Sequence, residues 1–597
     1  MNTKQLRLLF YDFEIFQYDW MVVIIDYNTR RKKIIVNNRD ELIKFYELAK
    51  DNYIWIGYNS RNYDSVILKG IILGMNPKEL NDKLIIDGLK PFQISKEFNK
   101  IQLYSYDTMV NRGESLKQLE GMMGHMIKES DVDFNINRKL TKDEINETIY
   151  YCTHDVEETI EVFENTKSDF DAVFGLINLF NLPLTYITKT KAQLTATILG
   201  AKKMSTPSSP EDYQFVDCLK LDRYNWIKDW YDKNRSDKII NEKGKEVTKG
   251  LTTDIFGLKH QLGIGGLHSA IPKYYTDNSD GSIIVHQDIA SYYPNMMVNH
   301  GLLSRAVEEP DRFKKMLEQR LQYKAEGNPL NKCLKISINA CYGVTNDQFN
   351  PMYDPQRSRE ITINCQLLLV DLIEKIETQL GSELCTYIQG NTDGLIFKLK
   401  NKEAYDKLIE ISSEWEDRTG FKFEYDEISK IAQKDVNNYV FEFTNGKLEC
   451  KGSYLQFNKP LKNDMSILND ALREYLIHGT PVEDTINNCN DLIKFQHINK
   501  IGGSYYKVMW GDKELKEKVI RTFACKKDLP GLFKVKKVIN KDGEEVDSIQ
   551  KVANNSEHIF IDNGDITDKK CPEYLDKQWY IDEANKRVKA FGVSIND

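Results

Sequence analysis

Two aspartates follow strand-like segments that lie far apart in the chain. Asp288 ends an apolar run, and Asp393 lies in a Gly-Asn-Thr-Asp-Gly turn between two further apolar runs. Between them, a helical pattern carries Lys335, Asn339 and Tyr342 on one face. Carboxylates on neighbouring strand ends can share divalent cations, and a facing lysine can hold a triphosphate. These residue types predict phosphoryl-transfer chemistry, with nucleotide polymerisation as the leading hypothesis.

The segment 311–344 strengthens that hypothesis, because its pattern predicts two helices with a Gly-Asn-Pro break at 327–329. Arg320 and Lys324 share one face of the first helix. An antiparallel pairing of the two helices places Arg320 opposite Lys335. Cations that converge on one surface need an anion between them, and a triphosphate fits this requirement.

A second acidic set begins near the N-terminus. Asp12 and Glu14 alternate with apolar residues in a strand-like run, so their side chains point to the same side. Asp64 follows the next strand-like run, and a later helical pattern places Tyr151 and Asp155 on one face. Adjacent buried carboxylates repel one another, and a bound cation relieves that repulsion.

The second set resembles the three motifs of proofreading DEDDy 3′–5′ exonucleases. The motif residues in chain order are Asp12 with Glu14, Asn59 with Asp64, and Tyr151 with Asp155. The resemblance implies an RNase H-like domain over about residues 1–165, in which the four carboxylates hold two Mg²⁺ ions. It further implies that Tyr151 orients the attacking water and that Asn59 contacts DNA.

The first set resembles the motifs of family B DNA polymerases. The run from Asp288 to Pro294 is similar to motif A (D-x-x-S-L-Y-P), with Tyr292 in the leucine position. The resemblance implies that Ser291 and Tyr292 line the nucleotide site. It also implies that Tyr293 packs under the incoming sugar and excludes a 2′-hydroxyl.

Motifs B and C of the same family are also similar to segments of this chain. Lys335, Asn339 and Tyr342 match K-x-x-x-N-S-x-Y-G, with alanine in place of the serine. Asn391 replaces the first aspartate of the motif C sequence D-T-D-S, whereas Asp393 keeps the second. The resemblance implies two Mg²⁺ ions at Asp288 and Asp393, with Mn²⁺ as a substitute. The residues implied to bind the nucleotide are Arg320, Lys324, Lys335, Asn339, Tyr342, Tyr293, Ser291 and Tyr292.

Shorter similarities predict contacts with DNA. Lys434 and Tyr439 occupy the place of a primer-strand K/T-x-Y motif, and Lys451 with Gly452 resembles the end of a K-x-K-G strand. Gly265 and Gly266 resemble the Y-x-G-G loop between exonuclease and polymerase domains, without its tyrosine. Ordinary surface sequence is the alternative interpretation of the K/T-x-Y-like and K-x-K-G-like segments.

The expected fold class is a multidomain α/β protein. An RNase H-like exonuclease domain precedes a right-hand polymerase with an antiparallel palm sheet, helical-hairpin fingers and a thumb. The expected regions are 1–165 (exonuclease), 166–280 (connection and start of the palm), 281–304 (palm), 305–345 (fingers), 346–455 (palm) and 456–597 (thumb and C-terminal region). The short intervals between Asp288, Lys335 and Asp393 favour a nucleic-acid primer over a protein primer.

Composition limits the partners and the compartment. The net charge of −8 argues weakly against nucleic acid, but basic and aromatic residues are interleaved in 505–541, which suits contact with a phosphate backbone. The ten cysteines form no C-x-x-C pair and predict reduced thiols. We expect primer–template DNA and dNTPs as partners, no membrane association, a monomer, and a cytoplasmic location, in the host cell if the source is a phage or other virus.

Three rival functions stay open. The first is a 3′–5′ exonuclease that keeps the polymerase fold with weakened or lost synthesis, for which Asn391 is the best argument. The second is a non-catalytic DNA-binding derivative, and the third is a template-independent transferase. The presence of Asp288, Asp393 and Lys335 argues against loss of function, because such loss removes these residues as readily as any others.

Overall fold

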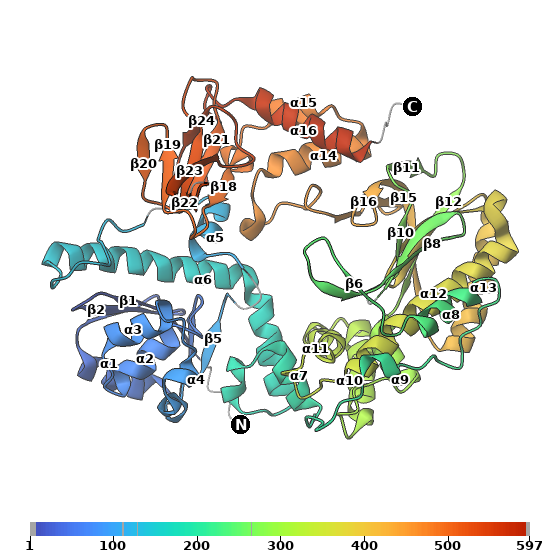
Figure 1. Cartoon of the computed structure of the whole chain (residues 1–597), viewed down its shortest axis with the longest axis horizontal. Coiled ribbons are helices and arrows are strands. Elements are labelled where there is room, and N and C mark those ends of the chain that lie inside the picture. Colours follow the sequence, from blue (N-terminus) through green and yellow to red (C-terminus); the bar gives the residue numbers. More distant parts are fainter. Residues whose placement is uncertain (1–6, 110–112, 128, 264, 542, 593–597) are drawn as a thin grey trace. The chain divides into compact units, whose positions relative to one another are not determined.

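The computed structural model describes residues 7–109, 113–127, 129–263, 265–541 and 543–592. The chain folds into two compact units, each with mixed helix and sheet (Figure 1). Unit 1 comprises 1–190, 458–466 and 490–580, and unit 2 comprises 191–457, 467–489 and 581–597. Among the described residues, no helix has both the length and the apolar character that a bilayer crossing requires.

Unit 1 contains a five-stranded sheet in the order β3-β2-β1-β4-β5. Strands β2 and β3 run antiparallel to their neighbours, whereas β1, β4 and β5 are parallel. Along β1, the apolar side chains are buried, and Asp12 and Glu14 alternate with them as the sequence predicts. The strands are β1 (Arg7–Ile15), β2 (Trp20–Asp26), β3 (Lys32–Val36), β4 (Tyr53–Gly57) and β5 (Ser105–Asp107).

Helices pack around this sheet, and the longest of them, α6, carries the predicted Tyr-x-x-x-Asp pair. A capping box between Thr141 and Glu144 fixes where α6 begins. Contacts join α6 to β1 and β2, which brings the helix to the strand that carries Asp12. The helices are α1 (Arg39–Ala49), α2 (Asp64–Ile72), α3 (Pro77–Ile85), α4 (Pro91–Ile94), α5 (Leu116–Met123) and α6 (Lys142–Leu179).

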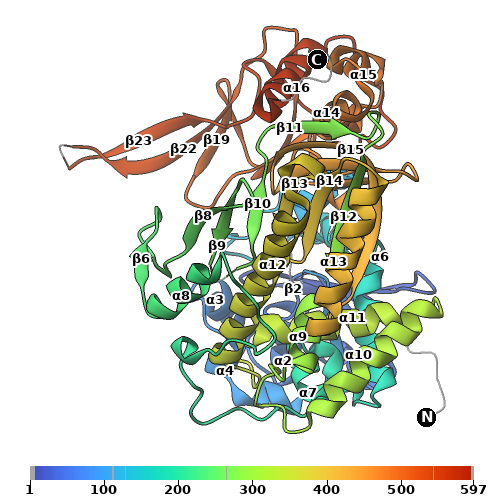
Figure 2. The same cartoon turned by 90° about the vertical axis from the view of Figure 1, so that its right-hand side faces the viewer.

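Two small antiparallel sheets from residues 490–580 complete unit 1. Arg521 on β21 is fully buried and donates hydrogen bonds to the carbonyls of Gly121 and His125, which attaches this region to the end of α5. Strands β22 and β23 form a long two-stranded ribbon (Figure 2). The strands are β18 (His497–Lys500), β19 (Lys507–Trp510), β20 (Lys513–Leu515), β21 (Val519–Ala524), β22 (Leu532–Ile539), β23 (Glu545–Lys551) and β24 (Ile559–Ile561).

Unit 2 is built on a ten-stranded sheet in the order β17-β16-β15-β12-β14-β13-β10-β9-β8, with β11 beside β15. Each of its neighbouring strand pairs is antiparallel. The strands are β8 (Leu251–Ile255), β9 (Leu258–Leu262), β10 (His268–Ala270), β11 (Tyr274–Asp277), β12 (Ile283–Ile289), β13 (Cys385–Asn391), β14 (Gly394–Leu399), β15 (Phe423–Asp435), β16 (Asn438–Phe443) and β17 (Leu448–Lys451).

Helices α12 (Pro355–Leu384) and α13 (Lys402–Thr419) pack side by side against this sheet (Figure 2). Gln287 of β12 is fully buried and donates to Ser412 of α13, so this side of β12 faces the helices. Because strand side chains alternate, Asp288 points to the opposite face. The helices therefore support the sheet from behind and leave the face with Asp288 for a cleft.

The remaining elements of unit 2 include the predicted pair of helices, α10 and α11, which pack on each other. The turn between them contains Gly327 with φ of 66°, in agreement with the predicted break. Strands β6 and β7 form a short antiparallel hairpin. These elements are β6 (Lys238–Ile240), β7 (Glu246–Thr248), α7 (Lys191–Ile198), α8 (Asn225–Lys233), α9 (Tyr292–Asn299), α10 (Pro310–Ala325), α11 (Leu330–Val344), α14 (Ser466–His478) and α15 (Val482–Asn488). Helix α16 (Lys577–Phe591) begins in unit 1, and its residues from 581 onward belong to unit 2.

Candidate active sites

In unit 2, sheet pairing brings Asp288 and Asp393 together at one end of adjacent strands. Asp288 on β12 pairs with Gly394 of β14 on one side and with Glu424 of β15 on the other. The amide of Ile289 donates to the carbonyl of Asp393 at 2.9 Å, which links the two acidic segments directly.

The turn that presents Asp393 is tightly constrained. Thr392 has φ of 63°, a left-handed conformation that β-branched residues rarely adopt, and its amide donates to the carbonyl of Leu267 at 2.8 Å. A Cβ atom on Gly266 would lie only 2.2 Å from the Thr392 hydroxyl. Gly266 therefore allows its segment to approach the turn, which is a structural role that the similarity to a DNA-contacting loop did not reveal.

The electrostatics of this pair suit a divalent cation. Burial, followed by repulsion from Asp393 and Glu424, raises the pKa of Asp288 to about 7. Partial removal of water raises the pKa of Asp393, although its own amide and Lys451 act in the opposite direction. Neighbouring carboxylates with raised pKa values are stabilised when a cation binds between them, so the residues fit a site for a divalent cation.

One cleft of about 400 Å³ opens on the two aspartates. Its acidic side has Asp288, Asp393 and Glu424, and helices α10 and α11 supply cations across from them. The predicted nucleotide-site residues all line this cleft, and they are Ser291, Tyr292, Tyr293, Arg320, Lys324, Lys335, Asn339 and Tyr342. The structure thus brings together the residues predicted from helical spacing and those predicted from the motif similarity.

Two of the cations in this cleft have partners on the sheet side. Arg320 is 8% exposed and donates to the Ser291 hydroxyl at 2.5 Å, while burial lowers the pKa of its guanidinium. Lys324 forms an ion pair with Glu424 at 2.7 Å. Both contacts join α10 to the strand ends that carry the acids.

Aromatic side chains form the inner wall of the same cleft. The rings of Tyr293 and Tyr342 lie 4.5 Å apart between centroids, and the Tyr342 hydroxyl bonds that of Thr362 at 2.7 Å. Tyr292 is 3% exposed and donates to the carbonyl of Cys365 at 2.7 Å. Tyr292 therefore anchors the segment to α12, whereas Tyr293 and Tyr342 form the surface that a bound molecule meets.

A second cleft of about 370 Å³ is lined by the same two acids. It shares Asp288, Thr392 and Asp393 with the first cleft, and Tyr439 and Lys451 also line it. The Lys451 ammonium lies 5.9 Å from the centroid of the Tyr439 ring, and these residues pair across β16 and β17. Tyr439 is 6% exposed and its ring stacks on that of Phe441, whereas Lys451 is exposed and can pair with a backbone phosphate.

The other predicted DNA-contact residues occupy different places. Lys434 on β15 lies 3.7 Å from Asp435 and does not line either cleft. Gly265 accepts a hydrogen bond from Gln366 through its carbonyl. Gly452 has φ of 100°, and a Cβ atom there would lie 2.4 Å from the Asn438 side chain, so a close turn explains this glycine.

In unit 1, four predicted carboxylates converge. Asp12 and Glu14 project from β1, Asp64 begins α2 and accepts from the amide of Phe13 at 3.1 Å, and Asp155 lies on α6. Burial and then the charges of Asp64, Glu14 and Asp155 raise the pKa of Asp12 well above its ordinary value. The repulsion indicates that the four carboxylates lie close enough to interact.

The pKa values of Glu14 and Asp64 in this site are also raised. Burial, then Asp155 and Asp64, raises the pKa of Glu14 to about 8, and burial raises that of Asp64 to about 7. The Cys152 thiol on α6 lies 3.6 Å from the Asp12 carboxylate and within 4.8 Å of a Glu14 oxygen. The crowded carboxylates again fit divalent cations.

Tyr151 and Asn59 lie near this site without a direct role that the contacts reveal. Tyr151 precedes Asp155 by one helical turn on α6 and packs against Tyr150 with ring centroids 5.3 Å apart. Asn59 is exposed in the turn after β4 with φ of 56°. Their predicted roles in orienting water and in contacting DNA stay predictions.

Sequence reasoning missed three charged residues in the two sites. Lys117 of α5 pairs with Asp155 at 2.7 Å and with Glu120 at 3.1 Å; burial lowers its pKa, but these two acids raise it more. Glu424 and Glu449 line the two clefts of unit 2. Acid–apolar alternation in 423–428 was a detectable signal for Glu424, whereas Lys117 has no local signal beyond a helix start.

Comparison with known proteins gives a partial match to a DNA polymerase. DNA polymerase 1 of Saccharolobus solfataricus is 24% identical over 196 residues, which is 32% of this chain and 20% of that protein. The match therefore spans about a fifth of the relative's length. The solved family B DNA polymerase from the archaeon Pyrobaculum calidifontis aligns with 99% of this chain and 78% of its own at 15% identity, with a TM-score of 0.41. No family model matches the sequence.

Proposed function

We propose that the chain is a DNA-directed DNA polymerase with a 3′–5′ proofreading exonuclease. One observation carries the proposal: Asp288 and Asp393 form the common wall of two clefts, one lined by cations and one by Tyr439 and Lys451. A nucleotidyl transfer needs a triphosphate and a primer end on either side of the same metal-binding acids. The partial sequence similarity to a DNA polymerase supports the same activity.

Each side of the polymerase site has a distinct task in this proposal. Arg320, Lys324 and Lys335 bind the triphosphate and offset charge on the leaving pyrophosphate. Tyr293 lies under the sugar and favours dNTPs, while Tyr439 and Lys451 hold the primer strand of a primer–template DNA. When bound, Mg²⁺ ions at Asp288 and Asp393 would lower the pKa of the primer hydroxyl and stabilise the charge that develops at the phosphate.

The acids of unit 1 supply the proofreading activity in this proposal. Asp12, Glu14, Asp64 and Asp155 are placed to hold divalent cations, which would activate water against a phosphodiester. Mg²⁺ is the proposed ion, with Mn²⁺ as a substitute. The sheet order β3-β2-β1-β4-β5 supports an RNase H-like domain, and Tyr151 is the proposed residue that orients the water.

A primer-extension gel with the purified chain tests the proposal. With Mg²⁺ and dNTPs, we expect extension of a matched primer, and without dNTPs we expect 3′–5′ degradation. Asp393→Ala should abolish extension and spare degradation, Asp12→Ala should do the reverse, and Asp435→Asn, outside both clefts, should do neither. A wild-type chain that degrades but never extends a matched primer contradicts the proposal.

The second candidate function is a 3′–5′ exonuclease with weakened or lost synthesis, and Asn391 favours it. Asn391 lines the cleft with Tyr439 and Lys451, where the motif usually has an aspartate, so this side has one charge fewer. We expect Asn391 to tune metal affinity or rate, because Asp393 is retained. The change Asn391→Asp should then raise the rate of an active polymerase, but it should leave an inactive one without synthesis.

A further inference from the structure

Glu449 is a charged residue of the second cleft of unit 2 to which the proposed function assigns no part. It lies on β17 and lines this cleft together with Asp288, Asp393 and Asn391. Glu449 and Lys451 are two positions apart on the strand, so their side chains point to the same face. The cleft that receives the primer strand in the proposed function therefore holds a further carboxylate besides the two aspartates.

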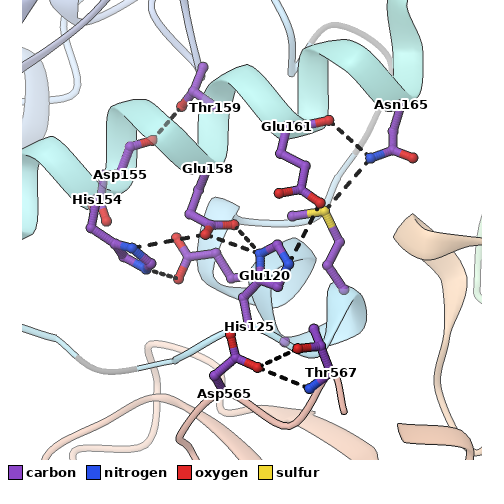
Figure 3. Close-up of polar contacts among 12 residues, drawn as sticks. Glu120, His125, His154, Asp155, Glu158, Thr159, Glu161, Asn165, Asp565 and Thr567 are labelled. Atoms are coloured by element: carbon purple, nitrogen blue, oxygen red, sulfur yellow. Dashed lines mark hydrogen bonds and ion pairs between the residues drawn. The ribbon is translucent and has the colours of Figure 1, made fainter. Parts of the chain in front are cut away.

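The neighbouring strand β16 holds the half-buried side chain of Glu449 in place. Glu449 pairs with Phe441, and the Tyr439 hydroxyl donates to Oε1 of Glu449 at 3.3 Å. In unit 1, by contrast, the Glu158 carboxylate lies 2.8 Å from Nδ1 of His125, a partner that can carry positive charge (Figure 3). The tyrosine hydroxyl is neutral, so its bond fixes the Glu449 carboxylate without cancelling the negative charge.

This charge reaches the acids of the proposed polymerase site. The pKa of Asp288 is raised by burial, then by the charges of Asp393 and Glu424, and then by that of Glu449. Lys451 acts in the opposite direction on Asp393, whose pKa is raised by burial. A negative charge that repels ionised Asp288 attracts a divalent cation bound at the same place, because the Coulomb energy changes sign with the charge.

Two departures from the motifs have opposite effects on the charge of this cleft. Asn391 stands where the D-T-D-S pattern has its first aspartate, so the turn lacks one carboxylate. Counted back from Lys451 and Gly452, Glu449 stands where the K-x-K-G pattern has its first lysine, so β17 carries a carboxylate in place of a cation. Both side chains line the same cleft. The first departure removes negative charge from the cleft, and the second adds it.

We propose that Glu449 is a positioning residue that supplies from β17 the negative charge that Asn391 does not supply from the turn. Glu449 acts through its charge on a cation held by Asp288 and Asp393, which stay the proposed ligands. The inference rests on the proposed function, because that cation belongs to the proposed polymerase site. It gives a physical reason why a chain with Asn391 can hold a cation tightly enough for synthesis.

Manganese binding tests the proposal without requiring catalysis. Mn²⁺ binding to the full chain without DNA is titrated by electron paramagnetic resonance, in an Asp12→Asn, Asp64→Asn background that removes charge from the acids of unit 1. Glu449→Gln keeps the acceptor for Tyr439 but loses the charge, so it should weaken affinity roughly tenfold. Adding Asn391→Asp to Glu449→Gln should restore the affinity. Rescue by a charge on another strand is a result that a packing role for Glu449 would not give.

A matched variant and a site variant complete the test. Glu427→Gln changes an exposed acid on the face of β15 that points away from the cleft, so it should leave affinity unchanged. If Asp288→Asn with Asp393→Asn removes no bound Mn²⁺, the metal site of the proposed function is wrong and the inference is wrong with it. If these changes remove Mn²⁺ but Glu449→Gln leaves affinity unchanged, or Asn391→Asp does not restore it, the charge exchange is refuted and the proposed function is not.

Thermal unfolding shows whether each variant is folded. If Glu449→Gln does not fold, Asn391→Asp in the otherwise unchanged background decides the question. A gain in Mn²⁺ affinity of about tenfold or more refutes compensation by Glu449, because the missing charge would then still be missing. A clearly smaller gain supports it.

Discussion

The two acidic sites counter their negative charge in different ways. In unit 1, the acids crowd together, and the contact with a cation is that between Asp155 and Lys117. In unit 2, two aspartates face Arg320, Lys324 and Lys335 across an open cleft. A phosphodiester carries one negative charge and a triphosphate carries several. The number of facing cations therefore fits the proposed hydrolysis of DNA in unit 1 and the proposed polymerisation of nucleotides in unit 2.

Among changes to residues around the acids, the largest effect should come from removing Lys335, whose side chain is exposed and lines the cleft. Lys335→Ala should lower kcat/KM for dNTP incorporation on the order of 10²-fold, because charge on the pyrophosphate is no longer offset. Single-nucleotide incorporation kinetics measure this change in kcat/KM. Degradation should be unchanged, and Lys315→Ala, exposed elsewhere on α10, should keep full activity. Equal losses of kcat/KM in Lys335→Ala and Lys315→Ala would contradict a specific role for the cations that face the acids.

Removing the cation of unit 1 should give the next largest effect. Lys117→Met deprives Asp155 and Glu120 of their partner and should slow degradation roughly 10- to 100-fold, because Asp155 is no longer held in place. A single-turnover degradation assay measures the rate, and extension should be unaffected. Lys142→Met, at the exposed start of α6, is the matched control. Slower extension with normal degradation in Lys117→Met would contradict this prediction.

A smaller effect should follow from crowding the turn that presents Asp393. Gly266→Ala places a Cβ atom 2.2 Å from the Thr392 hydroxyl, and the resulting shift should lower the extension rate about tenfold. Gly265→Ala, where nothing lies within 4 Å of the added atom, should be neutral. Adding Thr392→Gly should restore activity. If Gly265→Ala is the harmful change, the glycines act on DNA as the loop similarity suggests, and not on the turn.

The smallest effect concerns the dependence of stability on pH. Folding raises the pKa of Asp288 and Asp64 to about 7 and of Glu14 to about 8. The folded state then holds protons that the unfolded chain releases near pH 4, so the metal-free fold loses stability as pH rises from about 4, and the loss levels off at about 7–8. Mg²⁺ binds the ionised acids, so it should raise Tm by a few degrees more at pH 8 than at pH 6. Differential scanning calorimetry measures both shifts, and Asp288→Asn should reduce the difference. Equal shifts at the two pH values would count against metal-bound carboxylates.

The sequence predicted those parts of the sites that local pattern determines. Alternation placed Asp12 and Glu14 on one side of a strand, and the Gly-Asn-Thr-Asp-Gly run placed Asp393 at the tip of a hairpin. Helical spacing placed Lys335, Asn339 and Tyr342 on one face, and all three line one cleft. Each of these features depends on residues a few positions apart.

The missed features depend on long-range pairing. Glu424 reaches the site because β15 pairs with β12 in a particular register, and no local pattern specifies that register. Lys117 meets Asp155 because α5 packs on α6. Residues 490–580 fold with the N-terminal region, in part because buried Arg521 bonds the carbonyls of Gly121 and His125, whereas the sequence suggested one continuous C-terminal region.

The position of Asp288 and Asp393 on the wall between two clefts also has a kinetic meaning. A molecule in either cleft alone meets the acids from one side and leaves the other side to solvent. The proposed enzyme would then react when the nucleotide and the primer end are bound at the same time. Free nucleotides would be spared from futile hydrolysis, and the order in which the two substrates arrive would not matter for the outcome.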